Sequence, residues 1–216
     1  AHYSSVMAAT INGQPQYVQL LEQRLIALAP STGQLLWETE WPGRIAVIPT
    51  PVIRDNHVYI TTGYGVGSKR VTISPDNEVT VDYENKVMKN HHGGVVLLGD
   101  HLFGYSDKAG WVCQDFETGE SVWRERRDLG KGAISYADGR FYCLDERSGE
   151  MVLIAASTDG WQEHGRFTLD PQTELRKPKG KIWMHPVIVN GKLYLRDQEL
   201  LFCFDVSADS QRTAQR

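Results

Sequence analysis

Residues 27–37 read ALAPSTGQLLW, and residues 113–123 read CQDFETGESVW. The two stretches share a small first residue, a Thr-Gly pair and a closing Trp at the same spacing, and 86 residues separate Gly33 from Gly119. Glycine permits the positive φ that a tight turn needs, and a large indole packs well against a neighbouring sheet. This turn-and-tryptophan pattern therefore predicts a fold built from repeated, similar sheets.

A second repeat consists of two short β-rich runs that are joined by a two-residue turn. These turns are Asp55-Asn56, Gly99-Asp100, Asp138-Gly139 and Asn190-Gly191. Such residue pairs accept positive φ and favour tight hairpins. The second residues of successive turns lie 44, 39 and 52 residues apart. A period of about 40 residues with four short strands is typical of propeller blades. The longest interval contains the Pro- and Lys-rich stretch 170–181, which we interpret as an inserted loop.

The composition suits a globular β protein and narrows the classes of partner. The chain has 216 residues, of which 41% are hydrophobic and 23% charged, and its net charge is -4. It lacks the clustered basic footprint that nucleic-acid binding requires, so we predict no nucleic-acid partner. No apolar run approaches the roughly 18 residues of a membrane-spanning helix, so we predict no membrane span.

The three cysteines are Cys113, Cys143 and Cys203, and their odd number excludes complete pairing within the chain. Cys113 opens one copy of the turn-and-tryptophan pattern. Degenerate copies run from Cys143 through Ser148-Gly149 and from Cys203 onward, so all three share the register of Ala27. We predict that they are small, buried core residues rather than a disulfide pair or metal ligands.

The turn-and-tryptophan pattern resembles the tryptophan-docking motif of PQQ-like repeat β-propellers, in particular a bacterial secreted subfamily. The resemblance assigns the docking indoles to Trp37 and Trp123 and the preceding turns to Gly33 and Gly119. The first copy departs from the motif at Ala29, where Asp is expected. Further stretches that resemble the subfamily are residues 2–6, 48–51, 63–68 and 183–197. The resemblance covers about residues 3–206, and it is specific for fold and weak for function.

This resemblance implies an all-β, PQQ-like β-propeller of about five blades, each a four-stranded antiparallel sheet. Within one unit, 1–206, we expect blades at about 2–42, 46–88, 91–128, 130–170 and 181–206. The last blade ends after about three strands, and we expect a disordered polar tail at 207–216. Closed propellers of the family have more blades and complete the last one with a strand from the other chain end. We therefore expect a C-terminal portion of an incomplete propeller, a homodimer or an unusual small ring.

The first strand of each blade lines the channel of a propeller. Aligned first strands place Ser5, Thr50, His92, Lys131 and His185 at one channel mouth, which we predict to be a ligand-binding site. Imidazole is a common zinc ligand, but no His-x-x-x-His or Cys-x-x-Cys spacing supports a metal site, and we predict none. The alternative role of these histidines is hydrogen bonding to the backbone at the blade starts, which we favour.

Four aromatic residues lie outside the docking register, namely Trp111, Trp161, Trp183 and Tyr64. Large aromatic side chains anchor interfaces, so some of these could line a face that grips a peptide or glycan. For most of them we favour packing between blades.

Catalytic signatures are weak. Quinoprotein dehydrogenases of the wider family hold PQQ beside calcium, and many carry a vicinal cysteine pair, which this sequence lacks. No acidic cluster lies at the blade starts, where calcium would need oxygen ligands. Gly-x-Ser-x-Gly is absent, and the glycine-rich stretch 63–68 continues as a strand instead of opening a helix. We predict no catalytic residue and no cofactor.

The predicted function is therefore that of a non-catalytic propeller scaffold for protein–protein or ligand binding. We expect a protein partner or small ligand on the propeller face or axis, in the periplasm or outside the cell. Outer-membrane assembly lipoproteins share this fold and act as adaptors, which is the analogy behind the prediction. Two alternatives stay open: a fragment of a PQQ-dependent quinoprotein dehydrogenase with calcium, and a sugar-binding or accessory domain of a secreted enzyme.

Overall fold

Nineteen strands in five antiparallel sheets make up the computed structural model, which describes residues 2–207. Four of the sheets have four strands and the last has three. This confirms the predicted all-β fold of about five blades. Residues 2–207 contain no helix that is long and apolar enough to cross a membrane. The predicted polar tail, from residue 208 onward, lies outside the described residues.

Each sheet is a meander, in which strands that follow one another in the chain pair antiparallel. The first two sheets comprise β1 (Met7–Ile11), β2 (Gln14–Leu20), β3 (Arg24–Leu28), β4 (Leu35–Glu40), β5 (Val52–Arg54), β6 (His57–Thr62), β7 (Gly67–Ile73) and β8 (Val79–Asn85). The remaining three comprise β9 (Val95–Leu98), β10 (His101–Ser106), β11 (Gly110–Asp115), β12 (Ser121–Glu125), β13 (Gly132–Ala137), β14 (Arg140–Asp145), β15 (Glu150–Ala155), β16 (Glu163–Thr168), β17 (Val187–Val189), β18 (Lys192–Asp197) and β19 (Leu200–Asp205).

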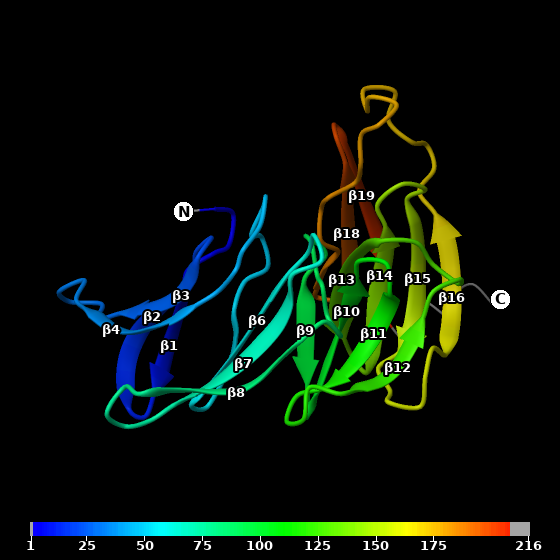
Figure 1. Ribbon diagram of the computed structural model, residues 1–216. Helices are drawn as coiled ribbons and strands as arrows, with labels where there is room; N and C mark the ends of the chain where they lie inside the picture. The colour runs from blue at the N-terminus through cyan, green and yellow to red at the C-terminus, as the bar shows by residue number, and fades with distance from the viewer. Residues whose placement is uncertain (1, 208–216) are drawn as a thin grey trace.

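The sheets follow one another in an open array (Figure 1). β4 contacts β8, β9 and β10 contact β13, and β13 contacts β17, so sheets that are neighbours in the chain pack together. The β1–β4 sheet lies apart from β18 and β19, and the array is not closed into a ring (Figure 1). The connection between β16 and β17 contains the predicted inserted loop and rises above the other blades at the top of the view.

All four predicted hairpin turns join the first and second strands of a sheet. Their first residues, Asp55, Gly99, Asp138 and Asn190, have φ between 47° and 56°. These residue types tolerate the left-handed region, which is why the pattern identified the turns. The corresponding turn of the first sheet, at Asn12-Gly13, has the same geometry but was not among the predicted turns.

The two docking tryptophans lie at interfaces between sheets. Trp37 is 4% exposed and belongs to the cluster that includes Val58 of the following sheet. Its indole Nε1 donates to Oε1 of Gln16 at 2.7 Å. The Nε1 of Trp123 donates across the interface to the carbonyl of Ser157 at 3.1 Å. Each indole thus buries its ring between sheets while its N–H keeps a partner.

The prediction for the cysteines is correct for Cys113 and wrong in part for the other two. Cys113 and Cys143 are buried, and burial raises the pKa of the Cys113 thiol to about 12. Cys143 lies on β14, the second strand of its sheet, whereas Cys113 lies on a third strand. Cys203 is exposed, because no other sheet of the described residues covers its face of β17–β19.

The register error at Cys143 has a local cause. The Oδ1 of Asp115 accepts the N–H groups of Glu117 and Thr118 in the turn between β11 and β12. The Oδ1 of Asp145 accepts two N–H groups in the same way, but in the turn between β14 and β15. An Asp-centred turn is specified by its own residues, so it does not determine which two strands of a sheet it joins.

Candidate functional site

A cavity of about 670 Å³ lies where the first strands of the five sheets converge; we call it the central cavity. Four of the five predicted ligand residues line it, namely Ser5, Thr50, His92 and His185. They come from the segments that lead into β1, β5, β9 and β17. The structure thus brings these four residues together, and a ligand at this place stays a prediction.

Close approach of backbones shapes the wall of the central cavity. The N–H of Ile134 donates to the carbonyl of Gly93 at 3.1 Å, which joins β13 to the segment before β9. A Cβ atom on Gly93 would lie 1.8 Å from the carbonyl oxygen of Gly132. A Cβ atom on Gly94 would lie 2.8 Å from Cε1 of His185. Only glycine fits at these two positions, which lets the sheets meet beside the histidines.

Both histidines of the central cavity have internal partners. Nε2 of His185 lies 2.8 Å from the backbone oxygen of His92, and Nε2 of His92 lies 2.6 Å from Oε2 of Glu146. Burial alone would raise the pKa of Glu146, but its contacts with His92 and the charge of Lys131 outweigh burial, and that pKa lies below its usual value. Nδ1 of His92 is buried and has no hydrogen-bond partner among residues 2–207.

The structure places Lys131 away from the central cavity. This residue immediately precedes β13, and its Nζ donates to Oδ1 of Asp107 at 2.7 Å and lies 2.9 Å from Nδ1 of His91. Its side chain lines a second cavity, of about 820 Å³. Glu146 also lines this second cavity, so the His92–Glu146 pair stands between the two.

Cationic side chains surround the second cavity, which we call the basic cup. They are Arg44, Lys86, Lys89, Lys108, Lys131 and Arg147. Each lies in a turn between second and third strands or in a connection that leaves a fourth strand or leads into the next sheet. In an antiparallel meander these turns and connections emerge at the same end of the sheet, so the fold gathers them. The sequence disperses the same charges over residues 44–147, and no linear pattern marks them.

Electrostatic crowding is evident in the cup and beside it. Burial lowers the pKa of Lys89, and the positive charges of Arg124, Lys108 and Lys86 lower it further, against Asp107. Burial also lowers the pKa of His91, with the charge of Lys131 acting in the same direction. Burial is the largest cause of both shifts in pKa, and the neighbouring cations act in the same direction as burial.

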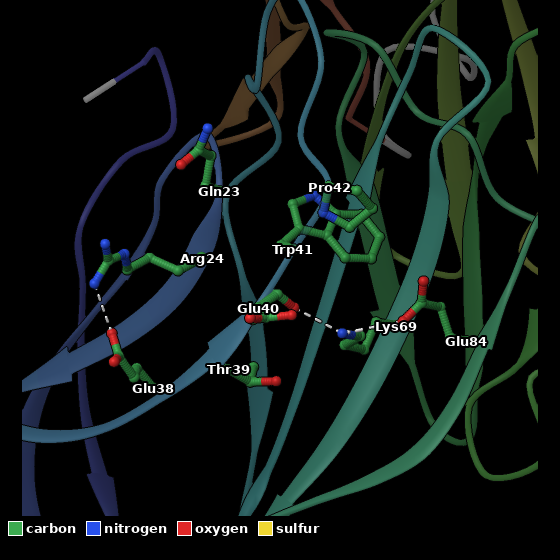
Figure 2. A pocket seen from close by; sticks show the side chains of 9 residues that line it. All are labelled: Gln23, Arg24, Glu38, Thr39, Glu40, Trp41, Pro42, Lys69 and Glu84. Carbon is green, nitrogen blue, oxygen red and sulfur yellow. Dashed lines mark hydrogen bonds and ion pairs between the residues drawn. The ribbon is translucent and has the colours of Figure 1, made fainter.

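A third cavity, of about 770 Å³, lies between the first and second sheets, and Figure 2 shows its lining. Both of its cations are paired. Arg24 and Glu38 form an ion pair at 2.9 Å. The Nζ of Lys69 donates to the carbonyl of Glu40 at 2.7 Å and lies 3.0 Å from Glu84. These contacts give Arg24 and Lys69 partners within the fold. We therefore interpret this cavity as part of the junction between the two sheets.

The four aromatic residues outside the docking register divide into two groups. Trp111 is 1% exposed, and it packs with Trp161 in a core cluster that spans two sheets. Trp183 is 60% exposed, and its indole Nε1 lies 3.3 Å from Glu146. Tyr64 is 37% exposed and packs edge-on against His91, with the ring centroids 4.7 Å apart. Blade packing therefore accounts for the first two, while the last two lie beside the basic cup.

The family model described as outer membrane protein assembly factor BamB matches residues 1–125. The chain belongs to this family. Among solved structures, BamB from Moraxella catarrhalis is similar, with a TM-score of 0.65 and 15% identity. The match covers 94% of this chain and 58% of that one, so the chain spans little more than half of that BamB.

Two further structures show the same kind of fold. The computationally designed Ika8 protein is similar, with a TM-score of 0.60, 9% identity and coverage of 93% of this chain and 67% of that chain. A chain of the Saccharomyces cerevisiae complex of Dbp5 with Nup159, Gle1, IP6 and ADP has a TM-score of 0.62 and 10% identity. The match covers 91% of this chain and 53% of that chain. No curated protein matches the sequence. These likenesses confirm the predicted PQQ-like β-propeller.

Proposed function

We propose that the chain is a non-catalytic β-propeller scaffold that binds protein partners, in the periplasm or outside the cell. The observation that carries the proposal is the match of residues 1–125 to a family described as an assembly factor for outer membrane proteins. An assembly factor acts by holding other proteins, and a propeller presents many turns on a rigid frame for that purpose.

The contacts of the predicted ligand residues support a scaffold rather than an enzyme. His92 is held by Glu146, His185 by a backbone oxygen and Lys131 by Asp107. Each of these polar side chains has a partner inside the fold, which gives it a structural role at a junction between sheets. Ser5 and Thr50 line the central cavity, and both are exposed.

The test is site-specific photo-crosslinking of the full-length protein in its native cell envelope. A photoreactive amino acid would replace Tyr64 at the cup, Val122 on β12 or Val189 on β17, all of which are exposed. We expect one or two of these positions to capture the same protein and the others to capture none. The three variants serve as controls for one another. We expect them at equal levels in the envelope, so a difference in capture reflects the position of the photoreactive residue.

A different outcome would support the dehydrogenase alternative. The proposal would be overturned by a purified protein that takes up PQQ with calcium and reduces an electron acceptor, with no protein adduct at any of the three positions. Binding of a neutral sugar without a protein adduct would equally count against it, and would favour the sugar-binding alternative.

A further inference from the structure

We propose that the basic cup binds an acidic peptide segment of a protein partner, with glutamate or aspartate carboxylates on its lysine and arginine side chains. This inference rests on the proposed protein-binding function and names the chemistry of the partner. Its site lies at the ends of the sheets, and it is separate from the predicted central cavity.

The first observation is that most cations of the cup have no partner. Arg44, Lys86, Lys89, Lys108 and Arg147 form no side-chain hydrogen bond and no ion pair within the described residues. Of these five residues, Lys89 is half-buried and the other four are exposed. The buried or half-buried cations Arg54, Lys69 and Arg70 elsewhere in the chain are paired, in contrast to Lys89. Unpaired cations that converge on one cavity are available to an anion from outside.

The carboxylates of the cup are fewer than its cations, and among the described residues none of them forms an ion pair with the five unpaired cations. Asp107 pairs with Lys131, and Glu146 pairs with His92. Asp145 accepts the N–H groups of its own turn. Six cations therefore face three occupied carboxylates around one cavity, in a chain whose net charge is -4. The excess positive charge belongs to this place and not to the protein as a whole.

The second observation concerns the apolar surface at the cup. Ile45 is 66% exposed and lines the cavity together with Tyr64, which is 37% exposed. Tyr105 adds a second aromatic ring to the lining. A small inorganic anion would leave this surface unused, whereas a peptide that alternates acidic and apolar side chains would cover it. A volume of about 820 Å³ accommodates several residues of such a peptide.

The third observation is the type of cationic residue in the cup. Four of the six are lysines, which interact as point charges and do not require the planar, two-oxygen geometry that arginine favours. They come from two connections between sheets and one turn within a sheet, so they can meet carboxylates that are spaced along an extended chain. Long-range attraction of this kind raises the association rate and weakens as salt is added.

The experiment measures binding by fluorescence anisotropy with a labelled peptide in which Glu alternates with Leu and Ser. The reference peptide carries Gln in place of each Glu, and inorganic phosphate is titrated as a competitor. The full-length protein is compared with the double variant Lys86→Gln with Lys89→Gln. The charge-matched control is Lys177→Gln with Lys179→Gln, two exposed lysines of the β16–β17 connection. Arg147→Gln is a second, single variant of the cup, and melting temperatures verify that each variant folds.

We expect the Glu peptide to bind, the Gln peptide to bind at least about tenfold more weakly, and the cup double variant to lose about tenfold in affinity. Arg147→Gln should weaken binding in the same direction, and the control should match the unchanged protein. Equal binding of the two peptides, or equal effects of cup and control variants, would overturn the proposal. So would displacement of the peptide by phosphate at equal concentration, since the cup would then be a site for inorganic anions.

The two proposals can fail separately. If photo-crosslinking captures a partner from Val189 or Val122 while the cup variants bind the peptide unchanged, the scaffold function stands and the cup has no part in it. If neither the peptide nor any envelope protein binds, both proposals fall.

Discussion

Arg70 shows how a charged side chain can join two sheets. Its Nε donates to Oδ2 of Asp82 at 2.8 Å, within its own sheet. Its Nη1 donates to the carbonyl of Phe116 at 2.8 Å and lies 2.7 Å from Oε2 of Glu117, both in the following sheet. The guanidinium carbon lies 4.9 Å from the centre of the Phe116 ring. The Arg70 side chain is 7% exposed, whereas that of Glu117 is 50% exposed, so the contact with Glu117 borders on solvent and the other contacts lie deeper.

Replacement of Arg70 by Met should destabilise the protein strongly. The variant keeps an apolar stem but removes the charged donor from Asp82 and from the carbonyl of Phe116, which keep only the hydroxyl donors of Thr72 and Tyr83. We expect the unfolding free energy to fall by about 2 kcal/mol. The control is Arg24→Met, which breaks the exposed pair with Glu38 and should cost less than about 1 kcal/mol. Urea unfolding followed by tryptophan fluorescence measures both. Equal losses for the two variants would show that the inter-sheet contacts of Arg70 contribute nothing.

At the residue scale, sequence patterns predicted side chains that recur at a fixed spacing and missed those that do not recur. Trp37 and Trp123 carry a repeated spacing, and both lie at sheet interfaces as predicted. Lys131 was expected at the channel, but its ion pair with Asp107 directs it into the basic cup. Arg70 left no signal, because its partners lie 12 and more residues away and follow no period.

Among the elements, the turn before the last strand of a four-stranded sheet differs between the first and third sheets. Gly33 and Gly119 occupy the same register and have φ of 71° and 74°. A Cβ atom on Gly119 would lie 2.7 Å from the Tyr83 ring and 2.7 Å from Nδ2 of Asn85, both on β8 of the preceding sheet. A Cβ atom on Gly33 would meet no atom within 4 Å. The preceding sheet accounts for the difference, since no described sheet comes before β1–β4.

Alanine at these two glycines should separate backbone strain from steric contact. Both substitutions place a side chain at positive φ, which costs about 1 kcal/mol. Gly119→Ala also drives a methyl group into Tyr83 and Asn85, and we expect a further loss of about 1–3 kcal/mol. Thermal and urea unfolding of the two variants measure the difference. If Gly33→Ala lowers the unfolding free energy of the full-length protein as much as Gly119→Ala does, another element packs against the first sheet at Gly33.

Turn chemistry explains what could be predicted about the elements. Asn-Gly and Asp-Gly pairs identify a hairpin from two residues, so the turns at Asp138 and Asn190 were predicted correctly. The turn at Asp145 was recognised but assigned to the wrong pair of strands, because its hydrogen bonds close within four residues. Which strands a turn joins depends on the order of pairing in the sheet, and that information is not local.

The whole molecule leaves an apolar sheet face uncovered at each end. Tyr17 and Leu35, both of which are in register with Leu28, point outward from the first sheet and are 45% and 46% exposed. Val187 and Leu201 are 52% and 69% exposed on the last sheet. Uncovered faces of this kind mark contact surfaces. Because the chain spans 58% of the length of one BamB, we expect further blades or a second copy to cover them.

Light scattering combined with small-angle X-ray scattering tests this expectation on the chain of residues 1–216. We expect an open, crescent-shaped particle, or a dimer of twice the mass of one chain because association would bury the apolar end faces. Leu201→Glu should disperse the dimer by placing a charge on one face. A compact monomer whose scattering matches a closed ring would contradict the expectation, and the central cavity would then be complete within this chain.

Contacts between neighbours in the chain have a consequence for how the protein loses its structure. Where sheets pack mainly on the sheets beside them, stability approaches a sum of nearest-neighbour terms, as in a one-dimensional lattice. The contact of His185 with the backbone of His92 is an exception. The terminal members of such a lattice have one interface instead of two, so fraying starts at β1–β4 or at β17–β19 and moves inward. Ring closure would remove both starting points at once, and would convert gradual melting into a single cooperative transition.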